Sequence, residues 1–383
     1  MNILLSVGRA PAALDLARAF HRAGHIVFMA ESFRAHISQP SNAITKNFFV
    51  PSPRHQTKAF IQALRNIIVD NKINLFIPTG EEIFYAAMER NELPCAVLSE
   101  SITKLNQLHS KWSFVISAMA NDLPAPETML IRSKDDLFHA YAQWRELVLK
   151  PVYSRFASQT MILPPLKLAL STLKFDPAVP WVAQGYTSGK HYSTYSICHH
   201  GHITAHTAYP ATFKAGLGTV VAFQHIEHPA MFKWVKTFVE KNKFTGQIGF
   251  DFIEKADGQL VALECNPRTT SGAHLLASNP KFVEAFYNPH QQCATPINNR
   301  PLMLAIGMLI HGLPAALQKK QFKTWLETFL SSDDVILDYK DPLPALLQFR
   351  RFFTLLSIAW KNRVSPFEAR TFDVEWNGDE KRG

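Results

Sequence analysis

The chain has 383 residues, of which 47% are hydrophobic and 19% are charged. This is the composition of a globular protein, and at roughly 100–200 residues per domain the length predicts two or three domains. No apolar run reaches the ~20 residues that a transmembrane helix needs. The segment Met1–Arg9 also lacks the basic start of a signal peptide. We therefore expect no membrane partner.

Four cysteines, none of them in a CxxC pair, fit a protein of the reducing cytoplasm. The net charge of +9 suits an anionic ligand. Because the chain has no arginine-rich arm, we expect that ligand to be a small molecule and not a nucleic acid.

Residues 1–105 alternate between apolar strands and amphipathic helices. Strands separated by helices predict a parallel, doubly wound sheet. The first turn, Gly8-Arg9-Ala10-Pro11, is not the GxGxxG turn that binds a dinucleotide, which argues against a dehydrogenase. The expected strands are Asn2–Val7, His25–Ala30 and Ile73–Pro78, and the expected helices are Pro11–Ala23 and Lys58–Asn71.

Residues 106–290 have a different pattern, typical of an α+β domain. Its strands are expected to pair mainly in antiparallel fashion, whereas residues 291–383 are predicted to form a mostly helical C-terminal extension. The expected helices are Ser110–Met119 and Ser133–Trp144, and the expected strands are Leu147–Lys150, Trp181–Tyr186, Tyr192–Cys198, His202–Ala208, Gln247–Lys255 and Gln259–Cys265.

The most informative segment is the pair of strands that Ala256-Asp257-Gly258-Gln259 joins. Asp-Gly between two apolar strands is a strong signal for a β-hairpin. With this dipeptide as a two-residue turn, Asp251 lies directly opposite Glu264, and their Cβ atoms are roughly 4.5–5.5 Å apart. Asn266 points to the same face because it is two residues beyond Glu264.

The same register predicts an apolar opposite face. Phe250 is expected to pair with Cys265, and Phe252 with Leu263. These four side chains then pack on a core, while the acidic face stays accessible.

Two carboxylates that face each other repel and destabilise a sheet unless something compensates their charge. Mg²⁺ takes oxygen ligands and usually needs only one or two carboxylates beside nucleotide phosphates, whereas zinc prefers His and Cys. Asp251, Glu264 and Asn266 are therefore candidate ligands of Mg²⁺ or Mn²⁺. The alternative is an ordinary hairpin whose two acids are neutralised by nearby Lys or Arg.

Four histidines surround a predicted turn at Gly201 and form a second candidate metal site. They alternate between the two faces of the expected hairpin, and no Cys or acid completes a set, so we favour an exposed polar hairpin over a zinc site. These residues are His199, His200, His202 and His206.

The segment Glu264-Cys265-Asn266-Pro267-Arg268 resembles the E-x-N-P-R motif of ATP-grasp enzymes, which include biotin carboxylase, carbamoyl-phosphate synthetase and carboxylate–amine ligases. The resemblance covers roughly residues 1–276. It implies the ATP-grasp fold, with a Rossmann-like pre-ATP-grasp domain over 1–105 and an ATP-grasp domain over 106–290 that includes a lid at about 112–187. It also implies ATP and Mg²⁺ as cofactors.

For activity, the resemblance implies an ADP-forming ligase. Such an enzyme activates a small-molecule carboxylate as an acyl phosphate, which an amine then captures with formation of a carbon–nitrogen bond. A homodimer is a possible assembly.

The resemblance assigns roles to residues that match the family's motifs. Lys150, at the end of an apolar strand, is similar to the Lys that contacts the α- and β-phosphates. Lys111 is similar to the second phosphate-side Lys, although it also fits an exposed helix position. Trp181–Gly189 resembles the hinge strand that reads adenine, with Gln184, Gly185 and Tyr186 as its contacts.

On the substrate side, Arg268 matches the Arg that faces the γ-phosphate or the acyl phosphate, and we assign it a catalytic role together with Lys150. The polar loop that follows supplies candidate substrate contacts, which also fit turn and helix-cap roles. These contacts are Thr270, Ser271 and His274.

Two features depart from the family pattern. The loop after Lys150 contains no glycine, so Arg155 and Ser158 would have to replace a backbone phosphate cradle. His191 stands where relatives place a ribose-binding Glu, and its ring can still donate or accept a hydrogen bond there. Two alternatives stay open: a carboxylase or carbamoylating enzyme that works through carboxyphosphate, and a catalytically weak ATP-binding module.

Overall fold

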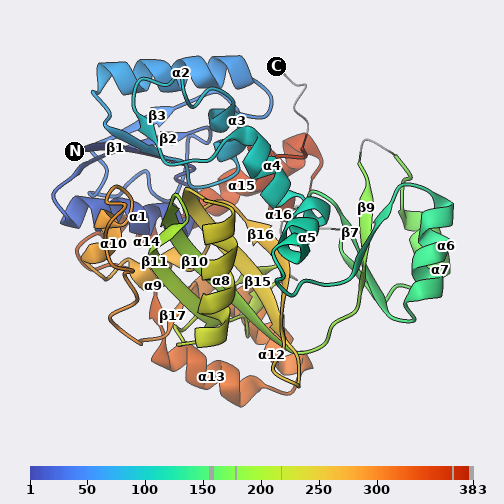
Figure 1. Cartoon of the computed structure of the whole chain (residues 1–383). Coiled ribbons are helices and arrows are strands. Elements are labelled where there is room, and N and C mark those ends of the chain that lie inside the picture. The colour runs from blue at the N-terminus through green and yellow to red at the C-terminus, as the bar shows by residue number, and fades with distance from the viewer. Residues whose placement is uncertain (155–158, 177–178, 217, 365, 379–383) are drawn as a thin grey trace.

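The computed structural model describes residues 1–154, 159–176, 179–216, 218–364 and 366–378 (Figure 1). Its N-terminal part is a parallel five-stranded sheet in the order β3-β2-β1-β4-β5. Helix α1 packs on one face of this sheet and helices α2 and α3 on the other. The elements are β1 (Asn2–Ser6), α1 (Pro11–Arg22), β2 (Ile26–Glu31), β3 (Lys46–Phe49), α2 (Thr57–Asp70), β4 (Leu75–Ile77), α3 (Glu82–Met88) and β5 (Ala96–Val97).

The predicted doubly wound parallel sheet is therefore confirmed. Alternation along β1 explains the two layers: Ile3 and Leu5 pack with α1, whereas Leu4 packs with α2 and α3. The short edge strands β3 and β5 were not expected from the sequence. They are too short to show a periodic pattern.

An antiparallel lid sheet lies at the right of Figure 1, in the order β6-β9-β7-β8. Helices α6 and α7 cover it through Leu137, Ala140 and Ala169. The lid is connected to the N-terminal part by α4 (Ile102–His109) and α5 (Lys111–Ala120). Its elements are β6 (Thr128–Ile131), α6 (Lys134–Gln143), β7 (Leu147–Pro151), β8 (Met161–Ile162), α7 (Leu166–Thr172) and β9 (Trp181–Gly185).

A central antiparallel sheet in the order β11-β10-β15-β16 lies between the lid and the N-terminal part (Figure 1). One of its faces contributes Tyr195 and Ile197 to the core that contains α1, so the two sheets share a core. The opposite face packs against α8. The elements are β10 (Lys190–His199), β11 (His202–Pro210), α8 (Pro229–Lys241), β15 (Gly246–Glu254) and β16 (Leu260–Asn266).

The core behind the central sheet is aromatic. Phe250 and Phe252 of β15 meet Trp234 and Phe238 of α8, with ring centroids 5.2 Å apart for Phe238–Phe250 and 5.1 Å apart for Trp234–Phe252. Phe114 of α5 completes this cluster. The sheet is thus anchored on one face, which leaves its other face to position polar groups.

The remainder of the chain is mostly helical, as predicted, but it also contains short strands. Strand β17 pairs with β14 and β18 in a small three-stranded sheet. These remaining elements are β12 (Lys214–Ala215), β13 (Thr219–Val220), β14 (Ala222–Phe223), α9 (Ala273–Leu276), α10 (Lys281–Glu284), β17 (Leu302–Met303), α11 (Ala305–Gly307), the π-helix η1 (Met308–Gly312), α12 (Leu313–Gln318), α13 (Phe322–Ser331), β18 (Asp333–Asp334), α14 (Leu343–Leu346), α15 (Gln348–Asn362) and α16 (Pro366–Ala369).

Within the residues that the structure describes, no helix combines the length and the apolar character needed to cross a bilayer.

The aromatic cluster predicts which core residue matters most for the central sheet. Phe238 is fully buried, and its replacement by Ala leaves a cavity behind β15, so Phe238→Ala should lower the free energy of unfolding by about 3–5 kcal/mol. Phe322→Ala is the matched control because this ring is 46% exposed on α13, and it should cost about 1 kcal/mol or less. Urea denaturation followed by circular dichroism measures both values. Equal losses in the two variants would contradict this description of the core.

Candidate functional site

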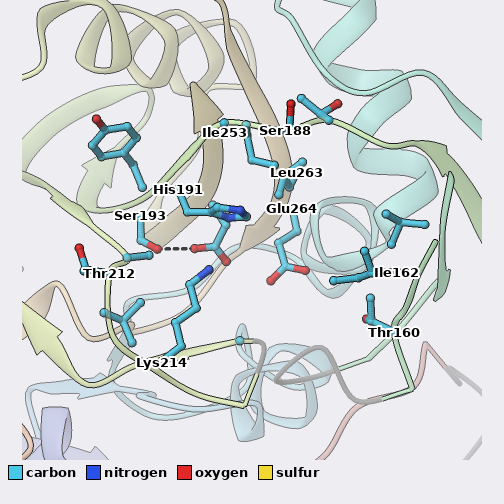
Figure 2. A pocket seen from close by; sticks show the side chains of 18 of the residues that line it. Thr160, Ile162, Ser188, His191, Ser193, Thr212, Lys214, Ile253, Leu263 and Glu264 are labelled. Carbon is cyan, nitrogen blue, oxygen red and sulfur yellow. Dashed lines mark hydrogen bonds between the residues drawn. The ribbon is translucent and has the colours of Figure 1, made fainter. Parts of the chain in front are cut away.

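A cavity of about 430 Å³ lies between the lid sheet and the central sheet. Its walls come from β7 and β9 of the lid, from β10, β15 and β16 of the central sheet, from the loop over 211–220 and from the end of α12. Figure 2 shows side chains from these elements converging on one space. The predicted site residues that line the cavity are Lys150, Gln184, Gly185, Tyr186, His191, Asp251 and Glu264.

The predicted pairing of Asp251 with Glu264 is confirmed, but the turn differs from the expected one. Phe250 pairs with Cys265 as expected. The loop has three residues: the Gly258 N–H donates to the Lys255 carbonyl oxygen at 2.9 Å, and Gly258 has a φ of 83°. A type I turn followed by a left-handed glycine makes this loop, which shifts the register by one residue relative to a two-residue turn.

A β-bulge at Leu263 restores the register. Phe252 pairs with Ala262 and not with Leu263, so the predicted Phe252–Leu263 pair is wrong. Leu263 is the extra residue, and it lines the cavity together with Glu264 instead of packing on the apolar face. The longer loop shifts the register by one residue, and the extra residue of the bulge shifts it back. The acid pair is therefore as predicted, but it depends on the bulge as well as on the Asp-Gly dipeptide.

Polar neighbours fix the position of the acid pair. Ser193 of β10 donates from its hydroxyl to Asp251 Oδ1 at 2.5 Å, as the dashed line in Figure 2 marks. Asn266 donates from Nδ2 to Asp251 Oδ2 at 3.3 Å. Asp251, Glu264 and Asn266 are thus adjacent on one face, and their oxygen atoms form the donor set that Mg²⁺ or Mn²⁺ prefers.

The pKa values of the two carboxyl groups are shifted in opposite directions. Burial and the neighbouring Glu264 raise the pKa of Asp251 well above its ordinary value. Burial acts in the same direction on Glu264, but Lys111 and Lys150 outweigh it and lower the pKa of Glu264. A divalent cation at this position would relieve the remaining repulsion between the two acids.

Two buried lysines stand on the lid side of the acid pair. Lys111 is the first residue of α5, which the Ser110 hydroxyl caps by accepting from the Ser113 N–H at 3.1 Å. Lys111 Nζ lies 3.7 Å from Glu264 Oε2 and donates to the carbonyl and the hydroxyl of Ser154, each at 3.1 Å. Lys111 is therefore a buried residue beside the acid pair, and the alternative of an exposed helix position is wrong.

Lys150 is the penultimate residue of β7 and lines the same cavity. Burial lowers the pKa of its ammonium to about 8, and Lys111 adds to this effect, while Glu264 and Asp251 oppose it. A buried ammonium that is costly to keep charged is stabilised by an anionic ligand beside it.

The opposite end of the cavity is less polar. Gln184 is buried and donates from Nε2 to the Thr128 hydroxyl at 3.1 Å. Ile162 of the lid lies across from Ile253 and Leu263 of the central sheet (Figure 2). Apolar walls beside the backbone of 185–188 suit a flat aromatic ring with hydrogen-bonding edges.

The structure adds two cations that the sequence did not indicate. Lys214, of β12, and Lys319, which follows α12, both line the cavity near His191. Burial lowers the pKa of His191 to about 4, and Lys214, Lys150 and Lys319 contribute to this shift. His191 is therefore neutral near pH 7. In the sequence, the glycines at 216 and 218 were only a weak indication that Lys214 belongs to the site. No motif indicates this for Lys319.

The predicted substrate-side residues lie around the cavity and do not line it. Arg268 donates to Asn266 Oδ1 at 3.0 Å, so it is adjacent to the acid pair. Thr270 packs against Gly249, and the Ser271 carbonyl accepts from the His274 N–H at 3.2 Å, which is a helix-start contact. Their substrate roles stay predictions.

His274 points away from the first cavity. Its Nδ1 lies 2.6 Å from Asp15 Oδ2, and both residues line a second cavity of about 450 Å³ at the other side of α9. Arg155 and Ser158, the proposed phosphate contacts, lie outside the described residues.

The described residues contain no group of three or more His, Cys, Asp or Glu side chains that could hold a metal ion.

In the histidine-rich hairpin, His199 and His202 contact the backbone carbonyls of Ala285 and Gln291. The expectation of an exposed hairpin is wrong for His206, which is buried and hydrogen-bonded to Ser196 at 2.8 Å. The face of this hairpin that carries His206 is covered by α8, whose Phe232 ring has its centroid 4.9 Å from that of the His206 ring, and the sequence pattern does not reveal this contact.

Comparison with known proteins gives a family and a fold. Residues 108–272 match the family model described as ATP-grasp domain. No curated protein sequence matches the chain.

Several solved structures are similar in fold. An N5-carboxyaminoimidazole ribonucleotide synthetase in complex with ADP has a TM-score of 0.65 and 13% identity, and the alignment covers 83% of this chain and 85% of that one. An L-amino acid ligase from Bacillus licheniformis has a TM-score of 0.59 and 13% identity, with 78% of each chain covered. The biotin carboxylase domain of Hydrogenobacter thermophilus 2-oxoglutarate carboxylase, crystallised with MgADP, ADP and bicarbonate, has a TM-score of 0.58 and 10% identity, with 74% and 68% covered.

The pKa of Lys150 predicts a pH dependence of nucleotide binding. Lys150 is charged below about pH 8 and loses its proton above it, so the affinity for MgADP should fall by about tenfold between pH 7 and pH 9. Isothermal titration calorimetry across this range measures the effect. Lys150→Met should bind more weakly at pH 7 and show a flatter profile. A wild-type affinity that does not change over this range would contradict the assignment of Lys150.

Proposed function

Because the chain is a member of the ATP-grasp superfamily, with its family domain at residues 108–272, we propose that it is an ADP-forming ligase. In this proposal, it activates a small-molecule carboxylate as an acyl phosphate and joins it to an amine. Solved relatives of this fold include ligases such as the L-amino acid ligase.

One observation carries this proposal: an acid pair and Lys150 line a cavity that also has an apolar wall, and a second buried lysine, Lys111, lies beside the acid pair. Asp251 faces Glu264, Lys111 lies 3.7 Å from Glu264, and Lys150 lines the same cavity. Acids to hold a divalent cation and cations to hold phosphate, next to an apolar wall, are what a magnesium nucleotide needs.

The chain's own residues would divide the work as follows. Asp251, Glu264 and Asn266 would hold Mg²⁺ or Mn²⁺, which supplies positive charge to the nucleotide phosphates. Lys111 and Lys150 would offset negative charge on the transferring phosphoryl group. The side chains of Asp251, Asn266, Glu264 and Lys111 contact one another or neighbouring side chains, which would limit the reorganisation needed at the moment of reaction.

The proposed reaction has two steps. A carboxylate oxygen of the substrate attacks the γ-phosphorus of ATP, the bond from that phosphorus to the β–γ bridging oxygen breaks, and ADP leaves. An amine nitrogen then attacks the acyl carbon, the carbon–oxygen bond to phosphate breaks, and the amine loses a proton. Arg268, adjacent to Asn266, is the proposed contact for the negative charge of the acyl phosphate.

A second candidate keeps the same site and changes the acid. Two of the similar structures are an N5-carboxyaminoimidazole ribonucleotide synthetase and a biotin carboxylase domain bound to bicarbonate. With bicarbonate as the acid, phosphoryl transfer would give carboxyphosphate, which carboxylates or carbamoylates an acceptor.

The test is a screen of ADP release against pairs of amino acids and small carboxylic acids, with bicarbonate as a separate arm. Stimulation by an acid–amine pair supports the ligase, and stimulation by bicarbonate supports the second candidate. MgATP binding without turnover across the whole panel would contradict both and favour a binding module.

Glu264→Gln should abolish ATP turnover while the fold stays intact. The substitution keeps the size of the side chain and removes the charge that faces Asp251, so ADP release should fall by about a hundredfold or more. Glu254→Gln is the matched control. Glu254 lies on the same hairpin but does not line the cavity, and its carboxylate contacts the Tyr192 hydroxyl and His228. Wild-type ADP production by Glu264→Gln would refute the site assignment.

A further inference from the structure

The segment 370–378 returns to the N-terminal sheet and lies at the carboxyl ends of its strands. Asp373 pairs with Arg9, which follows β1, at 2.5 Å, and the Trp376 ring stacks on Phe84 of α3 at 5.5 Å with an interplanar angle of 4°. In doubly wound sheets, this edge is where ligands bind. Here the chain's own C-terminal segment occupies part of it (Figure 1, near the label C).

This segment is hydrogen-bonded to a buried acid. Glu81, in the loop between β4 and α3, is fully buried. It accepts a hydrogen bond from the Trp376 N–H at 2.9 Å. A buried carboxylate requires such partners, because an unpaired charge in the interior is costly.

Glu81 also faces the reactive centre. Its Oε1 lies 3.7 Å from Arg268 Nε, and the Arg268 guanidinium in turn donates to Asn266 Oδ1 at 3.0 Å. Asn266 donates to Asp251 at 3.3 Å. A continuous chain of polar contacts thus runs from the backbone of Trp376 to the acid pair.

A second contact connects the same segment to the phosphate side. Gly378 packs so closely on Tyr153 that a Cβ added to it would lie 2.3 Å from the ring. Tyr153 directly precedes Ser154, which accepts two hydrogen bonds from Lys111. The segment 370–378 therefore approaches the site at two places. One is near Arg268, through Glu81, and the other is at Tyr153, next to Ser154.

We propose that residues 370–378 are a structural part of the reactive centre and that Glu81 is the positioning residue through which they hold Arg268 beside Asn266. This inference rests on the proposed function, since it concerns the orientation of an Arg in that reaction. The Arg268 guanidinium donates to Asn266 Oδ1 and the Thr269 carbonyl oxygen on one side and meets the Glu81 carboxylate on the other. Glu81 therefore fixes the direction of the side chain, and a misplacement of about 1 Å in a reacting group costs on the order of a hundredfold in rate.

The first test removes the charge of Glu81 and keeps its shape. Gln at position 81 still accepts from the Trp376 N–H. Glu81→Gln should therefore lower kcat for ADP release by about tenfold to a hundredfold and leave the Kd for MgADP within about twofold. Glu82→Gln is the matched control, because Glu82 is the buried first residue of α3, next to Glu81, but accepts from Ser6, Thr79 and Gly80. Its kcat should stay within about threefold of wild type. Wild-type kcat in Glu81→Gln, or equal losses of kcat and MgADP binding, would overturn the positioning role.

The second test concerns the C-terminal segment itself. Trp376→Ala and Trp376→Pro both lose the ring, but only proline also lacks the N–H that Glu81 accepts. Both variants should keep MgADP binding within about twofold. Trp376→Pro should have a kcat at least about fivefold below that of Trp376→Ala. Equal kcat values would overturn the coupling of this segment to Glu81.

A double-mutant cycle separates this inference from the proposed function. Glu81→Gln and Arg268→Gln are combined, and the unfolding midpoint in urea is measured for all four proteins. Non-additive shifts support the Glu81–Arg268 contact even if the wild-type protein releases no ADP, an outcome that would refute only the ligase proposal. Additive shifts would overturn the inference, whatever the ADP-release screen shows.

Discussion

The arrangement of the cavity depends on the repulsion between two carboxylates held face to face. Asp251 and Glu264 are paired across β15 and β16, and the sheet that carries them is anchored from behind by the aromatic cluster on α8. Such a pair is unfavourable by itself. The surrounding groups compensate this charge: Ser193 and Asn266 donate to Asp251, and Lys111 approaches Glu264. These contacts hold the two carboxyl groups side by side on one face of the sheet.

This electrostatic arrangement also explains why three parts of the chain meet at one place. The lid contributes Lys150, the central sheet contributes the acids, and the C-terminal part contributes Lys319. Lys150 and the two acids are buried or partly buried, and a charged group is costly to bury unless an opposite charge lies beside it. Charge pairing therefore complements the shared apolar core between the N-terminal and central sheets.

Local signals in the sequence predicted much of the fold and the centre of the site. Alternation of strand and helix predicted the parallel sheet, and the Asp-Gly dipeptide predicted the hairpin that pairs Asp251 with Glu264. The bulge at Leu263 was not predictable, because the choice between a two-residue and a three-residue loop depends on packing along the whole strand pair.

The long-range contacts were also missed, for a related physical reason. Lys319 and Glu81 reach the site only through tertiary packing, and no periodicity or spacing connects them to the acid motif. His206 was expected to be exposed because the hairpin pattern does not show that α8 covers this face, where Phe232 contacts the His206 ring. Sequence patterns report neighbours within an element, whereas these residues depend on neighbours from distant elements.

The return of the C-terminal segment to the first sheet has a consequence for the order of assembly. Arg9 and Asp373 are separated by 364 positions in the chain, yet they form a buried ion pair. During synthesis, the N-terminal sheet and the acid-bearing hairpin emerge from the ribosome well before Asp373 and Trp376 are made. A nascent chain can thus fold its scaffold early, while the polar contacts that orient Arg268 form only after translation has passed residue 376.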